Sequence, residues 1–143
     1  MKEKQLQDIT ALYGRLSRDD EVGGESMSIQ SQRAILGQYA KEHGFTNCQF
    51  FMDDGYSGTN FDRPAFTEMM ELVEQRRVRT IIVKDLSRLG RNYLEVGRYT
   101  EVIFPENKVR FIAITDGVDS AAGDNEFAPF KNIINEWYAK DIS

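Results

Sequence analysis

The stretch Thr80-Ile81-Ile82-Val83 is an unbroken β-branched run, and it leads directly into the polar sequence Lys84-Asp85-Leu86-Ser87-Arg88-Leu89-Gly90-Arg91. A short run of this kind predicts a strand that is buried on both faces, as in a parallel sheet covered by helices. Three further apolar stretches predict strands, and they are Ile9 to Leu16, Cys48 to Met52 and Val109 to Thr115. Polar residues follow each strand, so the chemistry of the chain is expected there.

The segments between these strands have the hydrophobic periodicity of helices. Ser28 to His43 predicts a helix with Ile29, Leu36 and Ala40 on one face, ended by Gly44. Asp62-Arg63-Pro64 predicts the start of the next helix, with Asp62 as the N-cap and with Phe66, Met69, Met70 and Val73 turned inward. Tyr93 to Phe104 predicts a third helix. Alternating strands and helices indicate one α/β domain over residues 1–143, with a mostly parallel central sheet of four to five strands flanked by helices.

The last segment has a different pattern. Phe127, Phe130, Ile134 and Trp137 recur at spacings of three, four and three, which is typical of a helix that packs along another helix. No glycine or proline follows Phe130, so we expect a long C-terminal helix that continues beyond this sequence. This helix either packs on its own domain or mediates self-association.

Composition limits the class of protein. One cysteine, Cys48, excludes an internal disulfide, and Cys48 with the single His43 cannot form a zinc cluster, so no metal or cofactor is expected. No apolar run approaches the roughly 20 residues that cross a bilayer, and the N-terminus lacks the apolar segment of a secretory signal. We therefore expect a cytoplasmic protein without membrane contact.

The charge is unevenly distributed. The whole chain carries −5, but Arg76 to Arg98 holds seven basic and two acidic residues, a net charge of +5 that leaves −10 for the rest. This asymmetry predicts one anion-facing patch on an otherwise acidic body. The simpler alternative is a solvated, arginine-rich turn.

Ser17 follows the first predicted strand and has Arg15 two residues before it, with no histidine nearby. Serine nucleophiles are usually activated by a histidine base, whereas arginine binds and neutralises phosphate oxygens. Arg88 and Arg91 are spaced to share a helix face, and Arg63 adds a third direction of approach. The combination indicates serine attack on a phosphodiester. Alternatively, the serine is a turn residue and the arginines form surface ion pairs.

Four collinear motifs carry a family resemblance: Tyr13-Gly14-Arg15-Leu16-Ser17, Ser28-Ile29-Gln30-Ser31-Gln32, Asp54 to Pro64, and Leu86-Ser87-Arg88-Leu89-Gly90-Arg91. Together they resemble the catalytic domain of the serine recombinases, the resolvase/invertase superfamily, and in particular its large branch, which includes transposases and integrases of mobile elements. The resemblance implies that Ser17 is a nucleophile that forms a 5′-phosphoserine link to DNA and releases a 3′-hydroxyl. It implies active-site roles for Arg15, Arg63, Arg88 and Arg91, and supporting roles for Tyr13, Gln30 and Ser57.

The resemblance also implies the partners. They are double-stranded DNA and further copies of the chain, which would form a dimer through the C-terminal helix and a tetramer during strand exchange, without metal or nucleotide. The family's DNA-binding regions follow the catalytic domain and are absent from this sequence. One departure is Ser87, because many small resolvases carry aspartate at that position.

Two other functions stay open at the level of sequence. One is a flavodoxin-like domain that binds a small anion or acts in signalling. The other is an assembly module that associates through its terminal helix and has an inert serine. In both cases the Ser17 hydroxyl would be dispensable.

Overall fold

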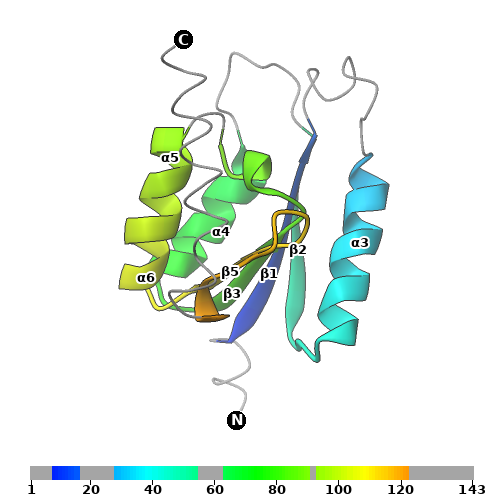
Figure 1. Ribbon diagram of the computed structural model, residues 1–143, viewed down its shortest axis with the longest axis horizontal. Helices are drawn as coiled ribbons and strands as arrows, with labels where there is room; N and C mark the ends of the chain where they lie inside the picture. The colour runs from blue at the N-terminus through cyan, green and yellow to red at the C-terminus, as the bar shows by residue number, and fades with distance from the viewer. Residues whose placement is uncertain (1–7, 17–27, 55–62, 91–92, 123–143) are drawn as a thin grey trace.

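A computed structural model describes residues 8–16, 28–54, 63–90 and 93–122 of the chain (Figure 1). Its centre is a five-stranded sheet in the order β2-β1-β3-β4-β5. The strands are β1 (Ile9–Leu16), β2 (Cys48–Asp54), β3 (Val78–Val83), β4 (Arg110–Ala113) and β5 (Val118–Asp119). The first four are mutually parallel and β5 pairs antiparallel with β4. The predicted α/β class and mostly parallel sheet are confirmed. The two-residue β5 is the one strand that was not located from the sequence.

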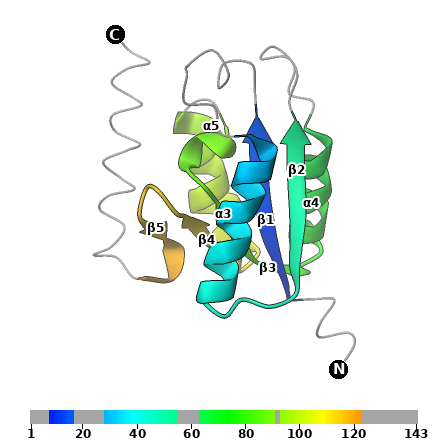
Figure 2. The same cartoon turned by 90° about the vertical axis from the view of Figure 1, so that its right-hand side faces the viewer.

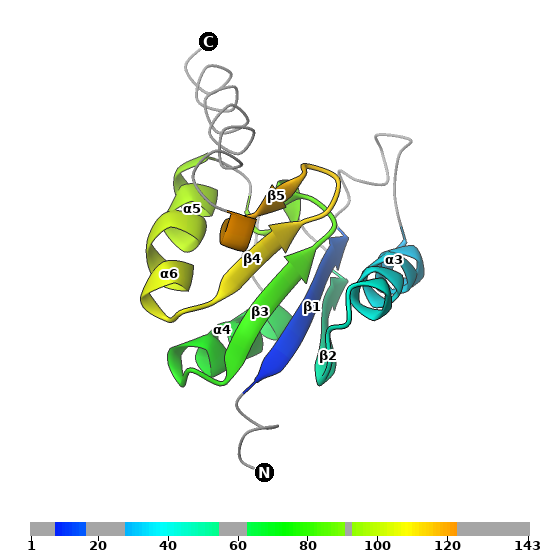
Figure 3. The same cartoon turned by 60° about the horizontal axis from the view of Figure 1, so that its bottom comes forward.

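Helices cover both faces of this sheet (Figures 2 and 3). One face carries α3 (Ile29–Glu42). The other carries α4 (Pro64–Glu74) and a continuous helical segment made of α5 (Tyr93–Arg98), a π-helical turn (Tyr99–Ile103) and α6 (Phe104–Glu106). The predicted helix from Tyr93 to Phe104 is therefore present, with the π-helical turn in its middle.

The strands alternate between two hydrophobic cores, as side chains on a pleated strand must. In β1, Ala11 and Tyr13 point into the larger core beneath α4, α5 and α6, whereas Leu12 points toward α3. In β3, Ile81 and Ile82 divide in the same way. Both faces of the central strands are thus buried, which accounts for the unbroken apolar run in β3.

Register brings the carboxyl ends of the central strands to one edge. Tyr13 lies opposite Val83 of β3, and Arg15 lies opposite Asp53 of β2. The segments that follow these three strands therefore begin beside one another. In parallel α/β sheets this edge is where ligands usually bind.

The start of α4 corrects one expectation. Arg63, not Asp62, is the N-cap residue, and its side chain makes no capping hydrogen bond. Instead Asp53, from the end of β2, accepts hydrogen bonds from the backbone N–H groups of Ala65 at 2.8 Å and Phe66 at 3.0 Å. The cap therefore comes from β2, which extends two residues beyond the predicted Met52.

The end of α3 agrees with expectation, since Gly44 adopts a φ of 75° and the chain turns there. The predicted stripe from Phe127 to Trp137 lies outside the described residues. None of the helices that the structure describes is long and apolar enough to cross a membrane.

Candidate active site

Five of the eight predicted site residues lie in the described part of the chain. Tyr13 and Arg15 are in β1, Gln30 is in α3, Arg63 precedes α4, and Arg88 ends the short 3-10 helix η1 (Leu86–Arg88). Ser17, Ser57 and Arg91 fall outside the described residues.

Arg15 and Arg88 hold the end of β1 to η1, the short helix that follows β3. The Arg15 Nη2 donates to the carbonyl of Ser87 at 2.7 Å, and the Arg88 Nη1 donates to the carbonyl of Arg15 at 2.6 Å. Arg88 is only 5% exposed. Because the two guanidinium groups cross between the segments, the last residues of β1 are fixed next to η1. Ser17 follows two residues after Arg15.

Arg63 joins the same assembly from the start of α4. Its Nη1 donates to the carbonyl of Leu89 at 2.7 Å, its Nη2 forms an ion pair with Glu95 at 3.2 Å, and its Cζ lies 4.0 Å from the centre of the Phe66 ring. Gly90 leaves the space for Glu95, because a Cβ at position 90 would lie 2.7 Å from the Glu95 carboxyl carbon. Three arginines from three separate segments therefore meet at one edge of the sheet.

Beneath these arginines lies a buried hydrogen bond between Tyr13 and Asp53. The Tyr13 hydroxyl donates to Asp53 Oδ2 at 2.8 Å, and both side chains are buried. Burial raises the pKa of Tyr13 well above its ordinary value, and the positive charge of Arg63 opposes that rise. Tyr13 therefore stays neutral and donates its hydroxyl proton. This hydrogen bond orients the Asp53 carboxylate that caps α4.

Gln32 contacts the site, whereas the predicted Gln30 is exposed on α3. The Gln32 amide accepts from the backbone N–H of Arg15 at 3.1 Å and donates to its carbonyl at 3.0 Å, and the side chain is fully buried. Gly14 makes room for this contact, since a Cβ there would lie 2.8 Å from Gln32 Oε1 and 2.6 Å from Met52 Sδ. The sequence held a signal for Gln32: it precedes Leu36 and Ala40 at intervals of four, on the buried face of the helix.

A second set of polar residues surrounds η1. Asp85 caps it, accepting the backbone N–H of Ser87 at 3.1 Å and the Ser87 hydroxyl, and its carboxylate forms ion pairs with Lys84 at 3.3 Å and Arg88 at 3.5 Å. Asp116, from the turn after β4, accepts the backbone N–H of Leu86 at 2.7 Å. Burial raises the pKa of Asp116. These two carboxylates fix the path of the chain leading to Arg88.

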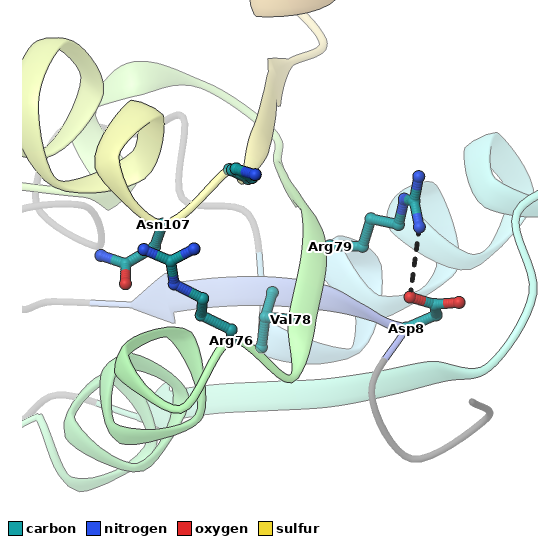
Figure 4. Close-up of a pocket in the computed structure, with 6 residues that line it drawn as sticks. Asp8, Arg76, Val78, Arg79 and Asn107 are labelled. Carbon is teal, nitrogen blue, oxygen red and sulfur yellow. Dashed lines mark hydrogen bonds and ion pairs between the residues drawn. The ribbon is translucent and has the colours of Figure 1, made fainter. Parts of the chain in front are cut away.

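The structure divides the predicted basic patch. Arg76 and Arg79 line a hollow of about 220 Å³ at the amino ends of β1 and β3, where Arg79 pairs with Asp8 (Figure 4). Arg88 lies beyond the carboxyl end of β3. The six residues of β3 separate the two groups by roughly 20 Å, at about 3.3 Å per residue. The prediction of a single anion-facing patch is therefore wrong, because charges close in sequence are placed at opposite edges by the strand between them.

The arrangement at the carboxyl edge fixes three guanidinium groups near the end of β1, and two of them are paired with the carboxylates of Glu95 and Asp85. Planar guanidinium groups bind phosphate oxygens, and the hydrogen bonds of these three to backbone carbonyls restrict their rotation. Among the described residues no group of three or more histidine, cysteine, aspartate or glutamate side chains is placed to hold a metal ion.

Comparisons with known proteins agree with this fold. The family model for the resolvase N-terminal domain matches residues 10–143. The N-terminal catalytic domain of TP901-1 integrase has a similar structure, with a TM-score of 0.73 and 25% identity over 93% of this chain and 98% of that domain. No curated protein matches the chain.

Two more distant structures share the fold. A resolvase-family site-specific recombinase from Streptococcus pneumoniae has a TM-score of 0.65 and 22% identity, covering 94% of this chain and 90% of its own. The C-terminal catalytic domain of ISC1926 TnpA, an IS607-like serine recombinase, has a TM-score of 0.54 and 24% identity, covering 94% and 84%. With the family model spanning nearly the whole sequence, the chain belongs to the resolvase family of serine recombinases and carries the N-terminal catalytic domain of that family.

Proposed function

We propose that this chain is the catalytic domain of a site-specific DNA recombinase in which Ser17 is the nucleophile. Ser17 attacks a phosphodiester of double-stranded DNA, forms a 5′-phosphoserine link and releases a 3′-hydroxyl. The observation that carries the proposal is the convergence of Arg15, Arg63 and Arg88 around the end of β1, the strand that leads into Ser17.

The chemistry fits these residues. Attack on a phosphodiester places additional negative charge on the phosphoryl oxygens, and preorganised cations stabilise this charge in the transition state. The proposal gives that role to Arg15, Arg63, Arg88 and Arg91, with Ser57 as a further polar contact. The phosphoserine ester retains the reactivity of the original bond, so a 3′-hydroxyl of another strand can displace the serine without a nucleotide cofactor.

Partners follow from the same proposal. Strand exchange requires cleavage of four strands, so the active form is a tetramer built from dimers that associate through the segment from Phe127 to Trp137. The net charge of −5 is unfavourable for tight binding to DNA phosphates. We therefore assign sequence-specific binding to regions that follow this domain in a longer cytoplasmic protein.

The test is a trapping assay with the full-length protein and its own recombination site on a nicked oligonucleotide. The wild-type protein should form a covalent protein–DNA adduct that resists denaturation, and peptide mapping should locate it at Ser17. Ser17→Ala should bind the oligonucleotide as well as the wild type and form no adduct. An adduct on another residue, or unchanged cleavage in Ser17→Ala, would exclude this assignment.

A further inference from the structure

The function proposed above assigns Arg63 to the phosphate, and the structure shows what holds its guanidinium group. The Nη1 atom donates to the carbonyls of Arg88 at 3.4 Å and Leu89 at 2.7 Å. The Nη2 atom donates to Glu95 Oε1 at 3.2 Å, and the Arg63 side chain is 10% exposed. These contacts do not use all of its N–H donors, so the group keeps donors for a phosphate oxygen.

The contact with Glu95 fixes the direction of this guanidinium group. The two carbonyls hold one Nη atom and leave the planar group free to turn about that atom. Glu95 holds the second Nη atom, and the Phe66 ring supports the group from one side, with its centre 4.0 Å from the Arg63 Cζ. Direction matters because the donors of arginine form a rigid planar fork that must face the phosphate oxygens.

The surroundings of Glu95 favour the same contact. Glu95 lies in the first turn of α5, and its side chain is 21% exposed. A Cβ at Gly90 would lie 2.7 Å from the Glu95 carboxyl carbon and 2.9 Å from Oε2, so glycine leaves room for the carboxylate. One helical turn later, the Tyr99 ring packs edge-on against Phe66, with ring centres 5.1 Å apart. Burial raises the pKa of Tyr99, and the nearby charge of Arg63 opposes that rise.

We propose that Glu95 is a positioning residue of the recombination reaction, which holds the Arg63 guanidinium group in the direction that stabilises charge on the phosphate; this rests on the function proposed above. Glu95 touches no reacting atom and transfers no proton, and it acts through Arg63. Asp85 forms a comparable ion pair with Arg88, but it also caps η1. A substitution of Asp85 would change that turn as well, so Glu95 is the better position for a test.

The simpler role of Glu95 is to stabilise the fold. A carboxylate in the first turn of a helix interacts favourably with the helix dipole, and loss of one partner of a largely buried ion pair is destabilising. The two roles differ in what they do to the reaction. Loss of a purely stabilising residue lowers the fraction of folded protein, whichever residue occupies position 63. Loss of a positioning residue lowers the rate constant of the folded protein, and only while Arg63 is present.

The experiment measures formation of the Ser17 adduct by the full-length protein on its nicked site in a single turnover, at saturating DNA. The final yield reports the folded fraction, and the rate constant reports the reaction itself. Glu95→Ala should lower the rate constant by roughly 100-fold, the order expected when a reacting group is displaced by about 1 Å, with a yield close to that of the wild type. If Glu95→Ala does not fold, Glu95→Met takes its place, because methionine has a similar length and is a poor acceptor.

Two further variants serve as controls. Glu95→Gln keeps an oxygen that accepts from Arg63, and it should be at least about tenfold faster than Glu95→Ala. Glu101→Ala removes an exposed carboxylate from the π-helical turn that follows α5, and it should change the rate constant by less than about twofold.

A double variant tests whether Glu95 acts through Arg63. Arg63→Ala/Glu95→Ala should react at least as fast as Arg63→Ala, because the carboxylate then has no guanidinium group to orient and its negative charge only repels the phosphate. A role in folding alone predicts the same loss from Glu95→Ala in both backgrounds.

Four results would overturn the proposal. They are a rate constant in Glu95→Ala that is above or within about threefold of the wild type, a loss confined to the yield, a Glu95→Gln variant as slow as Glu95→Ala, and a double variant more than about threefold slower than Arg63→Ala. If Arg63→Ala forms no measurable adduct, the first three decide. Failure of the proposed function is a separate outcome, because the wild-type protein would then form no adduct at Ser17.

Discussion

Arginines at the two edges of the sheet are held in different ways. At the carboxyl edge, Arg15, Arg63 and Arg88 donate to backbone carbonyls of neighbouring segments, and two of them are less than 10% exposed. At the amino edge, the Arg79 side chain is 71% exposed and makes a 3.3 Å ion pair with Asp8. Arg76 at the same edge donates to the Glu106 carbonyl at 3.3 Å but is also exposed, so the two edges differ in how deeply their arginines are buried.

This difference distinguishes arginines that are built into the fold from arginines on its surface, which a count of charges does not. Burying a guanidinium group costs free energy unless fixed hydrogen-bond acceptors replace the water that it loses. For the carboxyl-edge arginines, backbone carbonyls at the ends of β1 and η1 are these acceptors. Substitutions at the two edges should therefore differ strongly in their effect on the free energy of unfolding.

The largest effect is expected at Asp53, which supports the carboxyl edge from below. Asp53→Ala leaves a buried Tyr13 hydroxyl and the backbone N–H groups of Ala65 and Phe66 without their acceptor. We expect a loss of about 4 kcal/mol in the free energy of unfolding, from about 1–3 kcal/mol for each buried group that loses its partner. Urea denaturation followed by circular dichroism measures it.

The matched control for this prediction is Tyr13→Phe, which removes one of the three donors and keeps the ring against Phe66. It should cost less than half as much as Asp53→Ala. If Asp53→Ala costs under about 1 kcal/mol, the carboxylate does not hold β2 to α4 in the way described.

Arg88→Ala should have the second largest effect on stability. The substitution removes a buried side chain that links Asp85 to the Arg15 carbonyl, and we expect a loss of about 2 kcal/mol. Arg88 is only 5% exposed, so its removal affects the packed interior of the fold.

Arg79→Ala is the control for Arg88→Ala, because it also replaces an arginine by alanine, but at the amino edge. An exposed pair of this kind contributes between zero and about 1 kcal/mol, and we expect a change below about 0.5 kcal/mol. Thermal and urea denaturation of both variants measure the contrast. Equal losses at the two positions would mean that the edges do not differ as we describe.

Sequence predicted the sheet well because its signals are local. The β-branched run in β3 and the helical spacing of Leu36 and Ala40 depend on neighbouring residues, so periodicity alone finds them. The site was predicted only in part. The use of Asp53 as the cap of α4 and the pairing of Arg63 with Glu95 join residues far apart in the chain, and no local pattern encodes such partners.

The same limit explains the error over the basic segment. Counting charge from Arg76 to Arg98 treats sequence proximity as spatial proximity, but a strand carries the chain from one edge of the sheet to the other. Gln30 and Gln32 show that even near neighbours in sequence can face different surroundings. They are two residues apart on a helix and therefore point in different directions, and only Gln32 reaches Arg15.

A similarly small effect is expected for the ion pair between Arg110 and Asp119, which joins the start of β4 to β5, and its dependence on pH can be measured. Two hydrogen bonds link them, from Arg110 Nε at 2.9 Å and from Nη2 at 2.7 Å. The hydrogen bonds from Arg110 lower the pKa of Asp119, against the effect of burial. The folded protein therefore binds this proton less tightly than the unfolded chain does.

The sign of the pH effect follows. The stabilisation is fully present above the unfolded-state pKa of about 3.9 and disappears as pH falls through the lower folded-state pKa. Asp119→Asn should thus reduce stability at pH 7 by at most about 0.5 kcal/mol, because the Arg110 side chain is 41% exposed and solvent screens the pair. Wild type and variant should converge in urea denaturation below about pH 3. A difference that persists or grows there would show that Asp119 stabilises β5 through its shape or its hydrogen bond to the Ala121 N–H, not through its charge.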